Sequence, residues 1–133
     1  MRIVLDASVL IAAHIGRAGV CSQLFEEIVV GHDLVLSEFI LAEFERNLSV
    51  KFGFPASDIR SAADFLRRGA MFIEPQVIPV DVCRDADDLP IVGTAVAARA
   101  QLLVTVDSDR SSVGPYRDVA IIKPGQYWHR VGG

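Results

Sequence analysis

Four acidic side chains in this chain of 133 residues each lie beside a strongly apolar segment. A carboxylate in such a place is costly unless it is paired, protonated or bound to a cation. The sequence places no matching set of lysines and arginines beside them, and carboxylate oxygens are the ligands that hard divalent cations prefer. We therefore interpret four residues as a candidate metal-binding cluster: Asp6 after RIVL, Glu43 within EFILAEFERNL, Asp88 opening DLPIVGTAVAARA, and Asp107 ending LLVTVD.

The segments around these acids predict alternating strands and helices. Apolar runs typical of buried strands fall at residues 2–6, 34–36, 77–80, 101–106 and 119–123. Helical segments lie between them, and small polar residues or glycine mark their expected ends: Ser8, Ser37, Ser57 and Gly31. This alternation predicts an α/β fold, a three-layer α/β/α sandwich with a mainly parallel central sheet. No linker or repeat divides the sequence, so residues 1–133 are expected to form one domain.

That topology predicts where three of the acids meet. In open parallel sheets, ligands bind beyond the carboxyl ends of the strands. Asp6 ends the first strand and Asp107 ends the strand at residues 101–106. Asp88 begins the helix that follows the strand expected at residues 77–80, so we expect it at the same edge.

Glu43 needs a separate argument because its helix carries other glutamates. With Ile40 taken as zero on a helical wheel of about 100° per residue, Glu43 falls near about −60°, inside the arc that faces the core. Glu38 and Glu45 fall near about 160° and 140°, on the side that faces solvent. A lone carboxylate on a buried helix face needs a partner, which favours a place for Glu43 in the cluster.

Each member of the cluster also has an ordinary structural interpretation. Asp6, Asp88 and Asp107 could each cap the helix that follows, and only their expected convergence favours a shared site. Four nearby residues are accessory candidates, as further ligands, supporting hydroxyls, or simple turn, cap and strand residues: Ser8, Asp85, Thr105 and Asp109.

Composition and charge narrow the function classes. The hydrophobic fraction of 51% and charged fraction of 23% are typical of a compact soluble protein. A formal charge of −4 disfavours a general nucleic-acid-binding module, yet two bound divalent cations would cancel it, so a metal-dependent nuclease stays open. Cys21 and Cys83 are too few for a disulfide framework. No apolar run has membrane-spanning length and no leader pattern opens the sequence, so a cytoplasmic location is expected.

Four sequence blocks, in order, resemble the acidic blocks of the PIN domain: VLDASVLIAA, LSEFILAEFERNL, DLPIVGTAVAA and LLVTVDSD. Residues 83–109, followed by IIKPGQYW, resemble the branch of VapC-type toxins from toxin–antitoxin systems. The resemblance implies a metal-dependent ribonuclease that uses Mg²⁺ or Mn²⁺, forms a homodimer and is neutralised by a small antitoxin. It also implies an acidic site formed by Asp6, Glu43, Asp88 and Asp107. We expect Asp6 and Asp107 as direct ligands, with Glu43 and Asp88 completing the shell or orienting the attacking water.

The chain departs from the family pattern in two places. Ala7-Ser8 stands where many relatives have Thr-Asn, and Arg110-Ser111-Ser112 stands where relatives often have an apolar pair. Three alternatives to a toxin remain open at this point. They are a PIN nuclease with a housekeeping role in RNA processing, a non-catalytic binding module whose acids receive a partner's basic residues, and a phosphatase. The last is open because a carboxylate–metal site does not by itself choose between phosphate monoesters and diesters.

Overall fold

The computed structural model describes residues 1–16 and 19–131. The first half of the chain forms β1 (Arg2–Leu5), α1 (Ala7–Ile15), α2 (Val20–Gly31), β2 (Asp33–Leu36), α3 (Glu38–Val50), α4 (Ala56–Gly69) and β3 (Met71–Phe72). The second half forms the 3₁₀ turn η1 (Ala86–Asp88), α5 (Leu89–Ala98), β4 (Leu102–Val104), α6 (Ser108–Ser111), β5 (Ala120–Ile122), the 3₁₀ turn η2 (Pro124–Gln126) and α7 (Tyr127–Val131).

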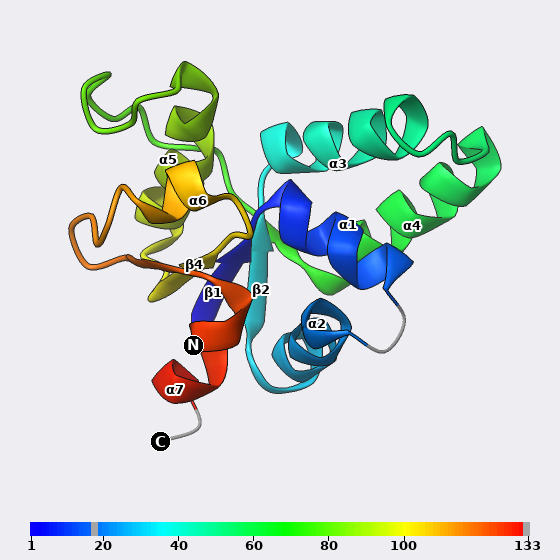
Figure 1. Cartoon of the computed structure of the whole chain (residues 1–133), viewed down its shortest axis with the longest axis horizontal. Coiled ribbons are helices and arrows are strands. Elements are labelled where there is room, and N and C mark those ends of the chain that lie inside the picture. The colour runs from blue at the N-terminus through cyan, green and yellow to red at the C-terminus, as the bar shows by residue number, and fades with distance from the viewer. Residues whose placement is uncertain (17–18, 132–133) are drawn as a thin grey trace.

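The five strands form one parallel sheet in the order β3-β2-β1-β4-β5. Helices α1 to α4, which connect β1 to β2 and β2 to β3, lie on one side of the sheet, and α5 lies on the other (Figure 1). This arrangement confirms the expected α/β sandwich with a parallel sheet. From β1 the chain continues to β2 on one side, and from β4 it continues to β5 on the other side. The connections that follow β1 and β4 therefore pass over opposite faces of the sheet. A crevice therefore opens at their carboxyl ends.

The core explains why such short strands are stable. Ile3, Val4 and Leu5 of the central strand have no exposed surface, because helices cover both faces of the sheet. In such a sheet the strands are nearly continuous apolar runs. The sequence pattern that predicted β1, β2, β4 and β5 is this continuous apolar run.

The strand expected at residues 77–80 is wrong. The strand that follows α4 is β3, which pairs with β2, and residues 77–80 run outside the sheet. Val77 and Val80 are 94% and 81% exposed, so their apolar character does not reflect burial. Pro75 precedes this stretch and Pro79 lies within it, and both lack the N–H group that a sheet ladder requires, which explains why it does not form a strand.

Two of the expected helix caps also differ in the structure. Ser8 does not cap α1, because Asp6 is the N-cap and its carboxylate accepts the Ser8 backbone N–H. Ser57 lies inside α4, whose N-cap is Pro55. Ser37 does cap α3 as expected, accepting the Ile40 backbone N–H at 3.4 Å.

The two cysteines do not form a disulfide bond. Cys21 and Cys83 are free thiols, and burial raises the pKa of both.

Among the described residues, no single helix is long and apolar enough to cross a membrane. Helices α1 and α2 reach that length and composition only when taken together across a bend.

Gly93 allows the segment after β3 to run directly against α5. The Gln76 backbone N–H donates to the Gly93 carbonyl at 3.0 Å. A Cβ built on Gly93 would lie well inside van der Waals contact with the Gln76 carbonyl oxygen. This close approach fixes α5, and with it the turn that carries Asp88.

Replacing Gly93 with alanine should therefore destabilise the protein. We expect Gly93→Ala to lower the free energy of unfolding by about 1–3 kcal/mol, because the backbone must shift to admit the methyl group. Urea denaturation of the two proteins measures this difference. Gly31→Ala is the matched control, since a Cβ at Gly31 meets no atom within 4 Å. Equal stability of Gly93→Ala and wild type would contradict the proposed contact.

Candidate functional site

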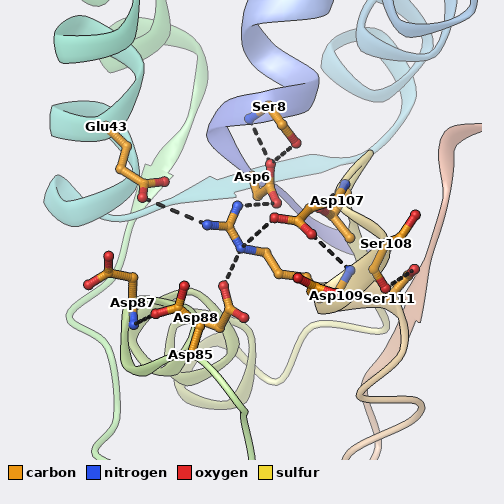
Figure 2. A network of polar contacts seen from close by, with 12 residues as sticks. Asp6, Ser8, Glu43, Asp85, Asp87, Asp88, Asp107, Ser108, Asp109 and Ser111 are labelled. Carbon is orange, nitrogen blue, oxygen red and sulfur yellow. Dashed lines mark hydrogen bonds and ion pairs between the residues drawn. The ribbon is translucent and has the colours of Figure 1, made fainter.

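Asp6 and Asp107 follow the two strands at the crevice. Asp6 comes directly after β1, and its backbone N–H donates to the Val104 carbonyl of β4 at 3.1 Å. Its Oδ1 accepts the Ser8 backbone N–H at 2.7 Å, which caps α1. Asp107 caps α6 in the same manner, accepting the Asp109 backbone N–H at 2.8 Å. Each aspartate thus caps a helix through one oxygen and directs the other toward the crevice (Figure 2).

Glu43 and Asp88 reach the same place from opposite sides of the sheet. Glu43 lies on the inward face of α3 and is 9% exposed, as the helical wheel predicted. Asp88 is buried at the junction of η1 and α5. Because α3 and α5 contact each other above the sheet edge, their carboxylates face the ends of β1 and β4 (Figure 2).

In the part of the chain that the structure describes, one arginine lies among all four carboxylates. The Arg110 Nη1 bonds Asp6 Oδ2 at 2.9 Å, and the Arg110 Nε donates to Asp88 Oδ1. Its Nη2 lies 3.8 Å from Glu43 Oε2, and its Nε lies 4.0 Å from Asp107 Oδ2. The sequence predicted no matching set of basic residues beside these acids, and it did not predict that this one arginine would lie among them. Arg110 is three residues beyond Asp107, so the turn of α6 brings it back over the cluster.

The electrostatics of the cluster are unbalanced. One guanidinium compensates only one of four negative charges, and the side chain of Arg110 is only 12% exposed. Burial raises the pKa of Glu43 and of Asp88, against the opposing effect of Arg110. Burial also opposes the charge of Arg110, yet the contacts with Asp88 and Asp6 outweigh it and raise its pKa. The site therefore favours additional positive charge.

The sequence profile of the PIN domain matches residues 2–109 of this chain. The chain belongs to the PIN domain family. A comparison with curated proteins gives no match.

Solved structures share this PIN fold at low sequence identity. VapBC2 from Rickettsia felis, bound to a DNA fragment from its promoter, matches with a TM-score of 0.67 and 15% identity, over 92% of this chain and 98% of that chain. VapBC-1 from Haemophilus influenzae matches with a TM-score of 0.65 and 17% identity, over 94% and 99%. VapC20 from Mycobacterium tuberculosis, a toxin that cleaves the sarcin–ricin loop, matches with a TM-score of 0.60 and 18% identity, over 89% and 98%. At these identities the similarity shows the fold.

The accessory candidates of this PIN domain divide into two pairs. Ser8 donates its hydroxyl to Asp6 and accepts the Val106 backbone N–H at 3.3 Å, so it ties the ends of β1 and β4 together. Thr105 is buried and accepts the Asp107 backbone N–H at 3.0 Å, which shapes the turn into α6. Asp85 and Asp109 are exposed at the rim. Asp85 accepts the Asp87 backbone N–H at 2.9 Å, and so shapes the turn that precedes Asp88.

Arg110 is the residue of the site that the sequence did not reveal. In the sequence, Arg110 was visible only as a departure from the PIN-domain resemblance, in which an apolar pair is often expected after the last acidic block. The i, i+3 spacing from Asp107 was the one further signal, because such pairs share a helix face. That signal depends on α6 being helical, and a helix of four residues is too short to produce a periodic pattern in the sequence.

The donor atoms suit a hard divalent cation. All four acids offer carboxylate oxygens, the ligands that Mg²⁺ and Mn²⁺ prefer. In the described residues, no three His, Cys, Asp or Glu side chains already lie at the spacing of a metal site. The guanidinium of Arg110 lies between the carboxylates, so their oxygens already bind one positively charged group. The chemistry of the donor atoms, and the fact that they already bind the guanidinium of Arg110, both indicate that these residues fit a metal ion.

An open groove of about 670 Å³ adjoins the cluster and leads along α3. Glu43, Asp107 and Arg110 line its inner end. Arg46 and Lys51 add positive charge farther along the same groove. An anionic chain lying in this groove would pass from these cations to the carboxylates.

The raised pKa of Glu43 predicts a pH-dependent effect of removing its charge. A carboxyl whose folded pKa is raised contributes stability below its unfolded pKa of about 4.3, and this stability is lost as the pH rises through the folded pKa. We expect Glu43→Gln, measured in EDTA, to raise the free energy of unfolding by more at pH 7 than at pH 4. Arg110, Asp6, Arg46 and Asp87 are the charged groups that act on Glu43.

Denaturation at the two pH values measures this difference. Glu45→Gln is the matched control, because Glu45 lies on the same helix but away from the buried face. An equal effect of Glu43→Gln at pH 4 and pH 7 would show that burial does not disfavour its ionised form.

Proposed function

We propose that this PIN domain is a metal-dependent endoribonuclease that cleaves RNA phosphodiester bonds. The observation that carries the proposal is the convergence of four carboxylates from β1, α3, α5 and α6 around one cation. A role in capping a helix or shaping a turn accounts for each acid taken separately. It does not explain why four like charges share one crevice when a single guanidinium compensates them.

The residues divide into two kinds by position. Asp6 and Asp107 end adjacent strands and are the proposed direct ligands of Mg²⁺ or Mn²⁺. Glu43 and Asp88 approach from the flanking helices, where they would complete the shell or orient the attacking water. A divalent cation held here supplies an activated water and compensates the charge of the phosphodiester. Ser8 and Thr105 fix the backbone on which the ligands sit.

RNA is the preferred substrate because of family membership and the adjoining groove. A phosphate monoester needs only the cluster, whereas a polynucleotide needs a path that tracks its backbone. Arg46 and Lys51 provide positive charge along such a path. We therefore place the RNA strand in this groove, with the scissile phosphate over the carboxylates.

We further propose that the protein is the toxin of a toxin–antitoxin pair. Neighbouring structures of the same fold are the VapBC pairs and the toxin VapC20. A second groove of about 690 Å³ on the opposite side of α1 is lined by aromatic residues of α2, α3 and α4, among them Phe25, Phe44 and Phe65. We assign this groove to a small antitoxin. We also propose that the protein forms a homodimer, as the resemblance to VapC-type toxins implies, and that it acts in the cytoplasm.

Removing the charge of Asp6 should abolish cleavage without unfolding the protein. Asparagine keeps an oxygen that can accept the Ser8 backbone N–H, so the cap of α1 survives while one metal ligand is weakened. We expect Asp6→Asn to reduce metal-dependent cleavage of a mixed RNA pool by about 100-fold or more. Cleavage is measured with Mg²⁺, with Mn²⁺ and with EDTA.

Asp64→Asn is the control for loss of an acidic residue, since Asp64 is exposed on α4. Full activity of Asp6→Asn would remove Asp6 from the site. Metal binding without cleavage by the wild-type protein would favour the non-catalytic binding module.

Expression in cells distinguishes a toxin from a housekeeping nuclease. We expect induced wild-type protein to arrest growth, because uncontrolled cleavage of RNA stops protein synthesis. Asp6→Asn at the same protein level should permit growth, and a small protein encoded next to this chain should restore growth to the wild type. Normal growth on induction of a protein that cleaves RNA in vitro would favour the housekeeping role.

A further inference from the structure

Arg110 and a divalent cation need the same carboxylate oxygens. Its Nη1 lies 2.9 Å from Asp6 Oδ2, and its Nε donates to Asp88 Oδ1. Those oxygens face each other across the crevice, and a metal in the cluster would bind them at about 2.0–2.6 Å. A guanidinium at hydrogen-bond distance from both leaves no room for an ion between them.

The charges reinforce this exclusion. A metal ion and a guanidinium repel each other strongly at short distance in a water-poor crevice. The guanidinium makes charge-assisted bonds to two buried carboxylates, and such bonds are among the strongest in proteins. Metal entry therefore requires these bonds to break, which lowers the apparent affinity for the metal.

We propose that Arg110 is a tethered competitor of the metal, an intramolecular cation that must leave Asp6 and Asp88 before the ion binds. This inference rests on the proposed function, because it takes the carboxylates as metal ligands.

The displaced side chain has a defined destination. Arg110 lines the inner end of the groove that carries Arg46 and Lys51, so a rotation of its side chain places the guanidinium over the proposed RNA path. Its backbone need not move, since Asp107 continues to cap α6. The same positive charge thus leaves the carboxylates and joins the cations that face the phosphates.

The test is a calorimetric titration of the metal-stripped protein with Mn²⁺. We expect Arg110→Met to bind Mn²⁺ at least about tenfold more tightly than the wild type, because methionine fills similar space without charge or a hard donor. Arg110→Lys keeps the charge and should stay closer to the wild type than to Arg110→Met. Arg67→Gln is the matched control, since it breaks an exposed ion pair with Glu38 away from the cluster, and its affinity should not change.

A second measurement needs no variant. We expect the Nε–H resonance of Arg110 in the wild-type protein to shift on titration with Mg²⁺, as the bond to Asp88 breaks. The side-chain signals of Arg67 should stay in place.

Each outcome bears on a distinct part of the inference. Equal Mn²⁺ affinity of Arg110→Met and wild type, or an Arg110 resonance unmoved by bound Mg²⁺, would overturn the competition and leave the proposed function intact. Equally tight binding by Arg110→Met and Arg110→Lys would show that the charge is not the cause, and would overturn it too. Absence of Mn²⁺ binding by every folded variant would overturn both the competition and the proposed function.

Discussion

The sheet brings four distant segments of the chain close together. The contacts between one guanidinium and four carboxylates then connect these segments. The acids come from the end of β1, the inner face of α3, the start of α5 and the cap of α6. Like charges at such distances repel, and the repulsion grows as water is excluded. Arg110 offsets part of it and so holds two flanking helices over the crevice. The architecture of the site depends on this unequal balance of charge.

The fold supplies the convergence through backbone geometry rather than through side-chain packing. Asp6 and Asp107 each use one oxygen to cap a helix, and the cap fixes the direction of the carboxylate. A buried strand that passes directly into a capped helix therefore sets both the position and the orientation of a proposed ligand. The cap and the proposed ligand are the same side chain, which is why the sequence could not decide between the two roles.

Features that follow from periodicity or from the alternation of strands and helices were predictable from the sequence, whereas individual side-chain contacts between distant elements were not. The buried strands and the inward phase of Glu43 follow from periodicity along a single segment. The strand expected at residues 77–80 failed because prolines override an apolar pattern. Asp88 was nonetheless expected at the correct edge, since its position depends on α5 and not on that strand. Arg110 was missed because its meaning lies in neighbours separated by up to 104 residues along the chain.

The pairing of β1 with β4 has a consequence for how the protein is made. Asp6 is translated long before its hydrogen-bond partner Val104, and 104 residues before its ion-pair partner Arg110. At about 5–20 residues per second, the nascent chain spends on the order of ten seconds without a complete carboxylate cluster. Until β4 inserts beside β1, the ribosome and message that produce the chain face an incomplete carboxylate site. An interior strand that waits for a late partner thus delays the proposed nuclease activity until β4 and Arg110 have been synthesised.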